Sequence, residues 1–512
     1  MDRMGRLNLS WYRRAQLSAR SGATSQLRSR RTLSSWSAAF ATILLAGSLG
    51  TISTNAAADP MEIGAWSAPF DIGVIGIHSV VLPTGEVLLF SYPATATGSR
   101  ARLYDPMTGT TTDVSIPYTR DAFCAGHSLL PDGRMFATGG HIPGTVLKRP
   151  GVKETDVFDP DARTWTPGPL MSQARWYPTN VALGNGKTLI FGGDIDASTP
   201  AITVESYNPS TNTLTTLPSS ANRDLNLYPR MHLLPDGRIP FVNLAKTRVF
   251  DPSTNSWSGV VAQLNFRSRG ETLSSVQLPN LNQIMDIGGR NNARGTTSTA
   301  EIIDFSQPQP QWQYTGSMSF PRMNGNAVLL PDGTVLMVGG GLGPKKYQSP
   351  VLQAELYDPV SESWSVMAAQ SVPRMYHSTA VLLPDGRVLS AGQDNGPTQN
   401  QRSAEIYSPP YLFRGPRPTI ASAPASVGYQ TQFTVSSPEA SDITRVAMMA
   451  PGSVTHAIDN GQRYVDLSFS HVGGDLVVTS PANGNQAPPG WYMLFVLNAD
   501  GVPSIASWIQ IA

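Results

Sequence analysis

The chain contains 512 residues, and its 37 basic residues nearly balance 36 acidic residues, which gives a net charge of +1. This balance gives no general electrostatic reason to bind nucleic acid or an anionic surface. Cys124 is the only cysteine, so an internal disulfide framework is excluded and a packed core has to stabilise the fold.

The first 58 residues have the pattern of an export signal. Residues 1–31 carry eight arginines and one acid, residues 37–52 are small and apolar, and residues 55–58 resemble a signal-peptidase site. Residues 29–33 also resemble a twin-arginine signal, which directs a folded protein across a bacterial membrane. A retained membrane anchor and a mitochondrial-type leader are the alternatives. We therefore expect a secreted or cell-surface protein, exported by residues 1–58 or associated with a membrane through them.

A turn of the type Pro-Asp-Gly returns along the middle of the chain at intervals of 44 to 53 residues. Its copies are Pro83-Thr84-Gly85, Pro131-Asp132-Gly133, Gly184-Asn185-Gly186, Pro235-Asp236-Gly237, Pro279-Asn280, Pro331-Asp332-Gly333 and Pro384-Asp385-Gly386. Apolar runs flank each turn, and the second run often ends in Gly-Gly, as at Gly139-Gly140. This pattern is typical of kelch-type β-propellers, in which each repeat is one four-stranded blade. The sequence therefore predicts an all-β, seven-bladed propeller over residues 59–415, because an irregular β-sandwich would not space its turns so evenly.

The seventh repeat lacks its last strand. Its third strand, Glu405-Ile406-Tyr407, runs into Pro409-Pro410, whereas an earlier repeat continues into a strand that contains Trp165. We expect the segment Gly64-Ala65-Trp66-Ser67 to supply the missing strand. Closing the ring in this way would remove exposed strand edges.

From about Pro416 the repeat stops and alternating β-type sequence follows, as in Gln432–Val435 and Trp491–Val496. This alternation predicts an immunoglobulin-like β-sandwich over residues 416–512.

One position of the repeat, seven residues before the turn proline, collects reactive side chains. It holds Gly76, Cys124, Tyr177, Tyr228, Thr272, Asn324 and His377, and Tyr376 directly precedes the last of them. Innermost strands of a propeller line its axis, so these positions should come close together. Each residue has an ordinary structural explanation alone, but a thiol, phenols and an imidazole at one ring position indicate a redox-active site. Phenolate and imidazole suit tetragonal Cu(II), although a four-ligand set would need one more histidine.

Several motifs then resemble the copper-radical oxidases, the family of galactose oxidase and glyoxal oxidase. The resemblance rests on Asp121–Cys124, Ala174–Tyr177, Arg374–Ser378, Thr455-His456 and Pro489–Val496, which occur in family order. The similar region covers roughly residues 64–512, which is nearly all of the chain that follows the predicted leader.

The resemblance implies a role for five residues. Cys124 would be joined through sulfur to the ring of Tyr177, which would bind copper and carry the radical. Tyr376 would be the axial ligand and general base, and His377 would be an equatorial ligand. His456 would be the last ligand, delivered by a hairpin of the C-terminal domain.

Three further residues are expected near the site. Trp176 directly precedes Tyr177, and Tyr228 and Arg230 share the mouth of the axis. Contact with substrate is one role for Tyr228 and Arg230, and a structural role is the alternative.

The family chemistry implies an oxidase with one copper ion and the Cys124–Tyr177 thioether radical as cofactors, and dioxygen as the oxidant that yields hydrogen peroxide. The Arg-Trp-Tyr of residues 175–177 resembles the glyoxal oxidase branch more than the galactose oxidase branch. Small aldehydes or primary alcohols are therefore the expected substrates, and galactose-type sugars are the alternative. A non-catalytic exported propeller that acts as a binding or matrix protein is the alternative from another class, but loss of a site residue would favour it and none is lost.

Overall fold

The computed structural model describes residues 59–93, 98–142, 150–242, 245–266, 272–291, 293–394 and 400–512. The predicted leader, residues 1–58, lies outside the described residues. Short helices occur at α1 (Pro60–Ile63), η1 (Ser219–Ala221), η3 (Pro410–Phe413) and η4 (Ala440–Asp442), and the other regular elements are strands. None of the helices within the described ranges is long and apolar enough to cross a membrane.

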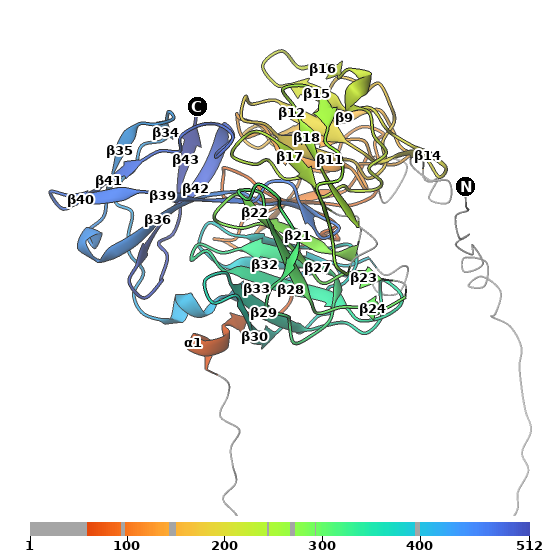
Figure 1. Cartoon of the computed structure of the whole chain (residues 1–512). Helices are drawn as coiled ribbons and strands as arrows, with labels where there is room; N and C mark the ends of the chain where they lie inside the picture. Colours follow the sequence, from red (N-terminus) through yellow and green to blue (C-terminus); the bar gives the residue numbers. More distant parts are fainter. Residues whose placement is uncertain are drawn as a thin grey trace, which may run out of the picture. The chain divides into compact units, whose positions relative to one another are not determined.

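Most of the chain forms small antiparallel sheets arranged as the blades of a β-propeller (Figure 1). The first two consist of β3 (His78–Val81), β4 (Val87–Phe90), β5 (Ala101–Tyr104) and β6 (Thr111–Asp113), and of β7 (Gly126–Leu129), β8 (Met135–Thr138), β9 (Thr155–Asp159) and β10 (Thr164–Pro167). They are followed by β11 (Thr179–Ala182), β12 (Thr188–Phe191), β15 (Glu205–Asn208) and β16 (Thr213–Thr216), and by β17 (Ile239–Phe241), β18 (Lys246–Asp251), β19 (Ser256–Trp257) and β20 (Ala262–Gln263).

The remaining blades continue this order. They consist of β21 (Ser274–Gln277), β22 (Gln283–Ile287), β25 (Ala300–Asp304) and β26 (Gln313–Tyr314), then of β27 (Met323–Leu329), β28 (Val335–Gly341), β29 (Gln353–Asp358) and β30 (Ser363–Ala369), and finally of β31 (Ser378–Leu382), β32 (Val388–Gly392) and β33 (Ser403–Ser408). Two small hairpins, β13 (Asp194–Asp196) with β14 (Thr199–Pro200) and β23 (Arg290–Asn291) with β24 (Gly295–Thr296), lie outside these sheets. The all-β propeller class is thus confirmed, while the number of blades stays a prediction of the repeat.

The repeated Pro-Asp-Gly turn joins the two inner strands of a blade. Between β7 and β8, Gly133 adopts a φ of 90°, a conformation that glycine reaches without a steric penalty. The carboxylate of Asp132 accepts the backbone N–H of Arg134 at 3.1 Å and closes the turn. The local sequence therefore sets where each inner strand begins and ends.

The strand expected from the segment Gly64–Ser67 is present. β1 (Ala65–Trp66) pairs with β33 through Ala65↔Ser408 and Trp66↔Tyr407, and β2 (Phe70–Asp71) pairs with the other end of β33. The indole N–H of Trp66 donates to the carbonyl of Ala368 at 2.9 Å. The prediction that the N-terminal segment completes the last sheet is confirmed.

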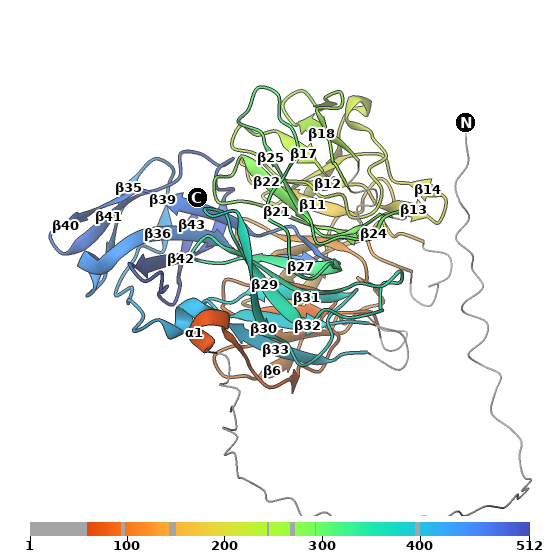
Figure 2. The same ribbon diagram turned by 60° about the horizontal axis from the view of Figure 1, so that its bottom comes forward.

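The C-terminal residues form a β-sandwich whose strands gather on one side of the molecule in both views (blue in Figures 1 and 2). One sheet contains β34 (Ser426–Val427), β43 (Ser507–Ile511), β42 (Gly490–Asn498), β36 (Ile443–Ala450) and β39 (Arg463–Leu467), and the other contains β35 (Gln432–Ser436), β41 (Asp475–Thr479) and β40 (Phe469–Val472). A hairpin of β37 (Ser453–Thr455) and β38 (Ile458–Asp459) leaves the sandwich and pairs with β3 of the propeller.

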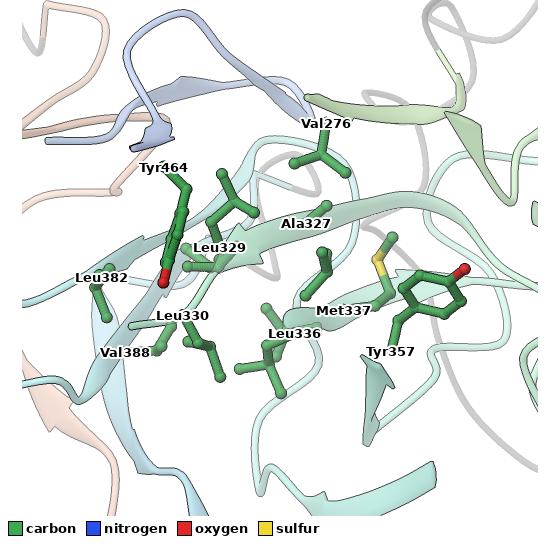
Figure 3. Packing of buried hydrophobic residues seen from close by; sticks show 14 of the residues in the cluster. Val276, Ala327, Leu329, Leu330, Leu336, Met337, Tyr357, Leu382, Val388 and Tyr464 are labelled. Carbon is green, nitrogen blue, oxygen red and sulfur yellow. The ribbon is translucent and has the colours of Figure 1, made fainter. Parts of the chain in front are cut away.

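One apolar core joins the propeller to this sandwich. Tyr464 of β39 lies beside Leu329 of β27 in the same buried cluster that includes Met493 and Phe495 of β42 (Figure 3). Burial of this shared surface holds the hairpin in a fixed position relative to the propeller axis.

Candidate metal centre

The ring positions predicted from the repeat share an unusual backbone conformation. Cys124, Tyr177, Tyr228, Asn324 and His377 all have positive φ, at 62°, 64°, 43°, 57° and 66°. A residue with a Cβ atom loses about 1–2 kcal/mol in this left-handed region, so such residues collect where function requires them. Cys124, Tyr177 and His377 lie just before β7, β11 and β31, and Asn324 is the second residue of β27.

A buried arginine supports several of these turns. The guanidinium of Arg175 donates to the carbonyl of Gly192 at 2.8 Å and pairs with Glu205 at 3.4 Å. Arg374 contacts Gly392 and Glu405 in the same way, at 2.8 and 3.5 Å. Related pairs are Arg120 with Asp156, and Arg322 with Glu355. Each arginine ties a glycine at the end of one inner strand to the third strand of its blade, which fixes the backbone next to the ring residue.

His456 lies at the tip of the hairpin β37–β38. Thr455 pairs with Ile458, so His456 and Ala457 form a two-residue loop, and both have positive φ, at 50° and 62°. This is the type I′ geometry that usually carries asparagine or glycine, so a histidine at this place is held there against its conformational preference.

The tautomer of His456 follows from its partners. The Thr455 hydroxyl donates to the carbonyl of Ile77 at 3.0 Å, so its oxygen accepts the Nδ1–H of His456 at 2.6 Å. The unprotonated Nε2 is therefore the nitrogen directed at the site, 3.8 Å from the Sγ of Cys124. This is the usual way in which an outer hydrogen bond orients a metal-binding imidazole.

The five residues assigned from the resemblance meet in one buried group. Ligand atoms of Cys124, His377 and His456 all lie within 4.8 Å of one another. The hydroxyl oxygens of Tyr177 and Tyr376 are 2.6 Å apart, and the ring of Tyr376 lies 3.9 Å from that of His377. Two phenols, two imidazoles and a thiol from both domains therefore share one small volume.

The ring of Tyr177 lies between two other aromatic rings. Trp176 stacks on it at 4.0 Å and 15°, and Tyr228 stacks at 4.4 Å and 20°. Two rings that are both so close and so nearly parallel cannot fit side by side on one face, so they cover opposite faces. Cys124 belongs to the same buried cluster. Electron-rich faces on both sides favour the loss of an electron from the Tyr177 ring.

Tyr376 has different surroundings. The ammonium of Lys346 lies 3.7 Å from the centroid of its ring, and Tyr347 makes an edge contact at 5.8 Å. A cation over an aromatic face is attracted by the ring electrons and opposes their removal. The same charge also reaches His456 and Cys124.

Burial sets the protonation of the group. It raises the pKa of Cys124 and of Tyr177 well above their ordinary values, and the neighbouring Cys124 and Tyr376 raise the pKa of Tyr177 further. Burial also lowers the pKa of His456 well below its ordinary value, and His377 adds to this effect. Near neutral pH the side chains of Cys124, Tyr177 and His456 are therefore uncharged, and binding of a dication through Tyr177 would release its proton.

The donor set fits a copper ion. Phenolate oxygen and neutral imidazole nitrogen are ligands suited to tetragonal Cu(II), and the thiol lies beside a phenol ring as a thioether link would require. Tyr177, Tyr376, His377 and His456 would hold the ion.

Tyr228 and Arg230, which were expected at the mouth of the axis, are buried and make structural contacts. The Tyr228 hydroxyl donates to the carbonyl of Ala125 at 3.0 Å. Arg230 donates to the carbonyls of Tyr228, Leu273 and His456, at 2.8, 3.0 and 3.3 Å. These bonds connect the hairpin tip to the propeller, which favours the structural alternative for both residues.

Sequence reasoning missed several residues of the centre. Lys346, His78 and His127 have no distinctive motif, because their contacts arise only when distant segments meet, and Thr455 was named only as part of the Thr455-His456 motif, without a role of its own. His78 is the first residue of β3 and His127 is the second residue of β7, so a histidine near the start of two consecutive inner strands is a signal that the sequence contained.

Comparisons with known proteins agree with this geometry. The family model described as glyoxal oxidase N-terminus matches residues 91–411, and the model described as galactose oxidase-like, Early set domain matches residues 417–511. A galactose oxidase of Gibberella zeae is 29% identical over an alignment of 492 residues that covers 88% of this chain and 71% of that protein.

Two further proteins extend the comparison. An aldehyde oxidase of Vitis pseudoreticulata, GLOX, is 32% identical over 76% of this chain and 82% of that protein. A fungal alcohol oxidase solved in complex with copper is similar in structure, with a TM-score of 0.77 and 25% identity, over 88% of this chain and 100% of that one.

Proposed function

The chain belongs to the glyoxal oxidase family of copper-radical oxidases, and we propose on this basis that it oxidises small aldehydes or primary alcohols with dioxygen and releases hydrogen peroxide. It is an oxidoreductase that uses a copper ion and a protein-derived radical. The observation that carries the proposal is the 2.6 Å contact between the hydroxyls of Tyr177 and Tyr376, inside a buried group with Cys124, His377 and His456.

This group is suited to a two-electron oxidation. An alcohol or aldehyde hydrate loses two electrons; a bound copper ion would accept one of them, and the Tyr177 radical would accept the other. A thioether between Cys124 and Tyr177 would lower the energy of that radical by spreading it onto sulfur.

The surroundings of the two phenols support different roles for them. Tyr177 is covered on both faces by aromatic rings, which suits the radical site. Tyr376 lies under the cation of Lys346, which suits a residue that exchanges protons rather than electrons. We assign Tyr376 as the general base that accepts the substrate hydroxyl proton, and Tyr177 as the group that takes a hydrogen atom from the adjacent carbon.

Access to the centre favours small substrates. Trp176, Tyr376 and His377 are 8%, 7% and 6% exposed, whereas Cys124 is fully buried, so a substrate would reach the group from the side of these three residues. Relatives named as an aldehyde oxidase and an alcohol oxidase support aldehydes or primary alcohols, and the relatives named galactose oxidase keep galactose-type sugars as the second candidate.

A direct test measures bound copper and peroxide release over a panel of small aldehydes, primary alcohols and galactose. We expect copper-dependent peroxide from the first two groups. Cys124→Ser should keep the fold and lose this activity, while Thr272→Ser, at the equivalent position of another repeat, should keep it. Full oxidase activity of Cys124→Ser would refute the radical mechanism.

We also propose a location for the enzyme outside the cell. We infer export by residues 1–58, with the propeller at residues 59–415 and the sandwich at residues 416–512, and a retained membrane anchor as the alternative. The secretion that we propose predicts a mature N-terminus close to residue 59 on protein recovered from the medium. Protein that stays in the membrane fraction with residues 1–58 attached would support the anchor instead.

A further inference from the structure

A chain of backbone hydrogen bonds runs through the strained ring residues and ends on a side chain. The N–H of Tyr228 donates to the carbonyl of Tyr177 at 2.8 Å, and the N–H of Tyr177 donates to the carbonyl of Cys124 at 3.0 Å. The next N–H in the series, that of Cys124, donates to the Nε2 of His78 at 3.2 Å. An imidazole thus takes the place that a carbonyl occupies at the other two steps.

The direction of the bond from Cys124 to His78 determines the directions of the hydrogen bonds that His78 and His127 make. His78 accepts at Nε2, so its Nδ1–H donates to the Nε2 of His127 at 3.1 Å. His127 then donates from Nδ1 to the Oγ of Ser453 at 2.6 Å, and the Ser453 hydroxyl donates to the carbonyl of His127 at 3.2 Å. Every polar hydrogen in this chain has one acceptor, and each imidazole is held in a single tautomer.

The side chains of this hydrogen-bonded series are shielded from water. His78, His127 and Ser453 are fully buried, and the ring of His78 stacks on Phe90 at 4.3 Å and 4°. Burial lowers the pKa of His127 to about 3 and keeps it neutral, as the donor pattern requires. Ser453 belongs to β37, the strand that leads to His456, so the chain also connects Cys124 to the hairpin of the C-terminal domain.

We propose that His78, oriented by His127 and Ser453, is a positioning residue that holds the Cys124 backbone in its left-handed conformation and thereby directs the thiol at the ring of Tyr177 for cross-link formation. This role rests on the proposed function and deepens it, since His78 acts through Cys124 and not on substrate. Cross-linking breaks the S–H bond of Cys124 and one ring C–H bond of Tyr177, and forms one S–C bond. Dioxygen takes up the two protons and two electrons that are released and leaves as hydrogen peroxide.

The experiment compares cross-link formation after Cu(II) is added to copper-free protein in air. His78→Phe keeps a flat ring against Phe90 but removes the acceptor, and His78→Gln offers an acceptor oxygen in its place. We expect His78→Phe to form the linked peptides at least about tenfold more slowly, as befits the loss of one buried hydrogen bond, and His78→Gln to recover most of the rate. Copper binding should persist in both variants because no ligand is changed.

The matched control is His232→Gln, which removes another histidine that is hydrogen-bonded to a serine, Ser275, at 2.8 Å. It should cross-link at the wild-type rate. Thermal unfolding checks the fold of each variant, and the rescue by glutamine is the readout that a merely structural role would not produce.

The outcomes separate this inference from the proposed function. Absence of the cross-link in the wild type would contradict the function itself. A normal rate in a folded His78→Phe variant would overturn the positioning role alone. If His78→Phe does not fold, Ser453→Ala decides, because it frees the tautomer of His127 while His78 stays in place. Slower cross-linking in Ser453→Ala supports the inference, and a wild-type rate overturns it.

Discussion

Two phenols of identical chemistry meet at 2.6 Å in this centre, and only their surroundings distinguish them. Tyr177 has aromatic rings on both faces and the thiol of Cys124 in its cluster. Tyr376 has the ammonium of Lys346 over its ring. In the mechanism that we propose, the polarity of the neighbours would therefore divide electron transfer and proton transfer between two side chains of the same type.

Lys346→Met tests this division, because it removes the charge and keeps the length of the side chain. A cation over an aromatic ring stabilises the reduced ring by about 0.5–2 kcal/mol, so the Tyr376 ring of the variant should be oxidised at a lower potential and should share the radical with Tyr177. Redox titration of the copper-loaded protein, followed by the radical signal, measures this change. Lys345→Met, which alters the exposed neighbour, is the control and should leave the potential unchanged. Equal potentials in both variants would show that Lys346 does not affect the oxidation of the centre.

Thr455→Val tests the fixed tautomer of His456. Valine has the shape of threonine but cannot accept the Nδ1–H, so the imidazole loses the bond that directs Nε2 at the centre. Loss of such an outer partner usually weakens metal binding by about 10- to 100-fold. Copper titration measures the affinity, with Thr434→Val at an exposed position of β35 as the control. An unchanged affinity in Thr455→Val would show that the hydroxyl does not orient the ligand.

Among the elements of the fold, the inner strands and their turns could be predicted from the sequence, because the same turn residues recur in each repeat. Gly133 and Asp132 close a turn with contacts confined to neighbouring residues, so no knowledge of the rest of the fold is needed. The ring positions followed from counting back from that turn.

The contacts of the hairpin β37–β38 could not be predicted in this way. His456 was assigned only through the family resemblance, because nothing in its local sequence states that β37 pairs with β3. His78 and Lys346 were missed for the same reason, since their partners Cys124 and Tyr376 are supplied by other segments. Contacts between side chains of different blades form only in the assembled propeller, so the sequence of a single repeat does not predict them.

The buried arginine–glutamate pairs of the blades allow two matched variants to be compared. Arg374→Met and Arg322→Met each leave a buried glutamate without its cation, which should lower the free energy of unfolding by about 3–5 kcal/mol in both. Only Arg374 supports the turn that leads to His377, so only Arg374→Met should also weaken copper binding. Urea unfolding and copper titration measure the two effects, and equal copper affinities in the two variants would mean that the arginine does not position the ligand.

At the scale of the whole molecule, one buried network connects the two domains to the centre. Ser453 and His456 come from the C-terminal hairpin, while Cys124, Tyr177 and His377 come from the propeller. The shared apolar core around Tyr464 keeps these segments in register. Because both domains contribute residues to the site, its geometry and the protonation of its buried histidines depend on the complete fold.

The buried histidines predict how the fold responds to acid. The pKa of His127 falls from 6.5 to about 3 on burial, so the unfolded chain binds more protons than the folded chain between these values. Its contribution to stability is fully present above pH 6.5 and is lost as the pH falls below that value, by about 2 kcal/mol at pH 5.

Urea unfolding at pH 7 and pH 5 measures this loss. His127→Gln is less stable than the wild type at both pH values, but it should lose less stability between them, because glutamine does not titrate. An identical pH dependence of the two proteins would contradict the neutral state of His127.

Peptide masses test whether Cys124 and Tyr177 form the radical site of a copper oxidase. Trypsin should release Cys124 in the peptide of residues 121–134 and Tyr177 in the peptide of residues 176–187. After treatment with Cu(II) in air, we expect these two peptides as one linked species, lighter than their sum by the two hydrogens lost. Two separate, unmodified peptides from protein that has bound copper would contradict the account.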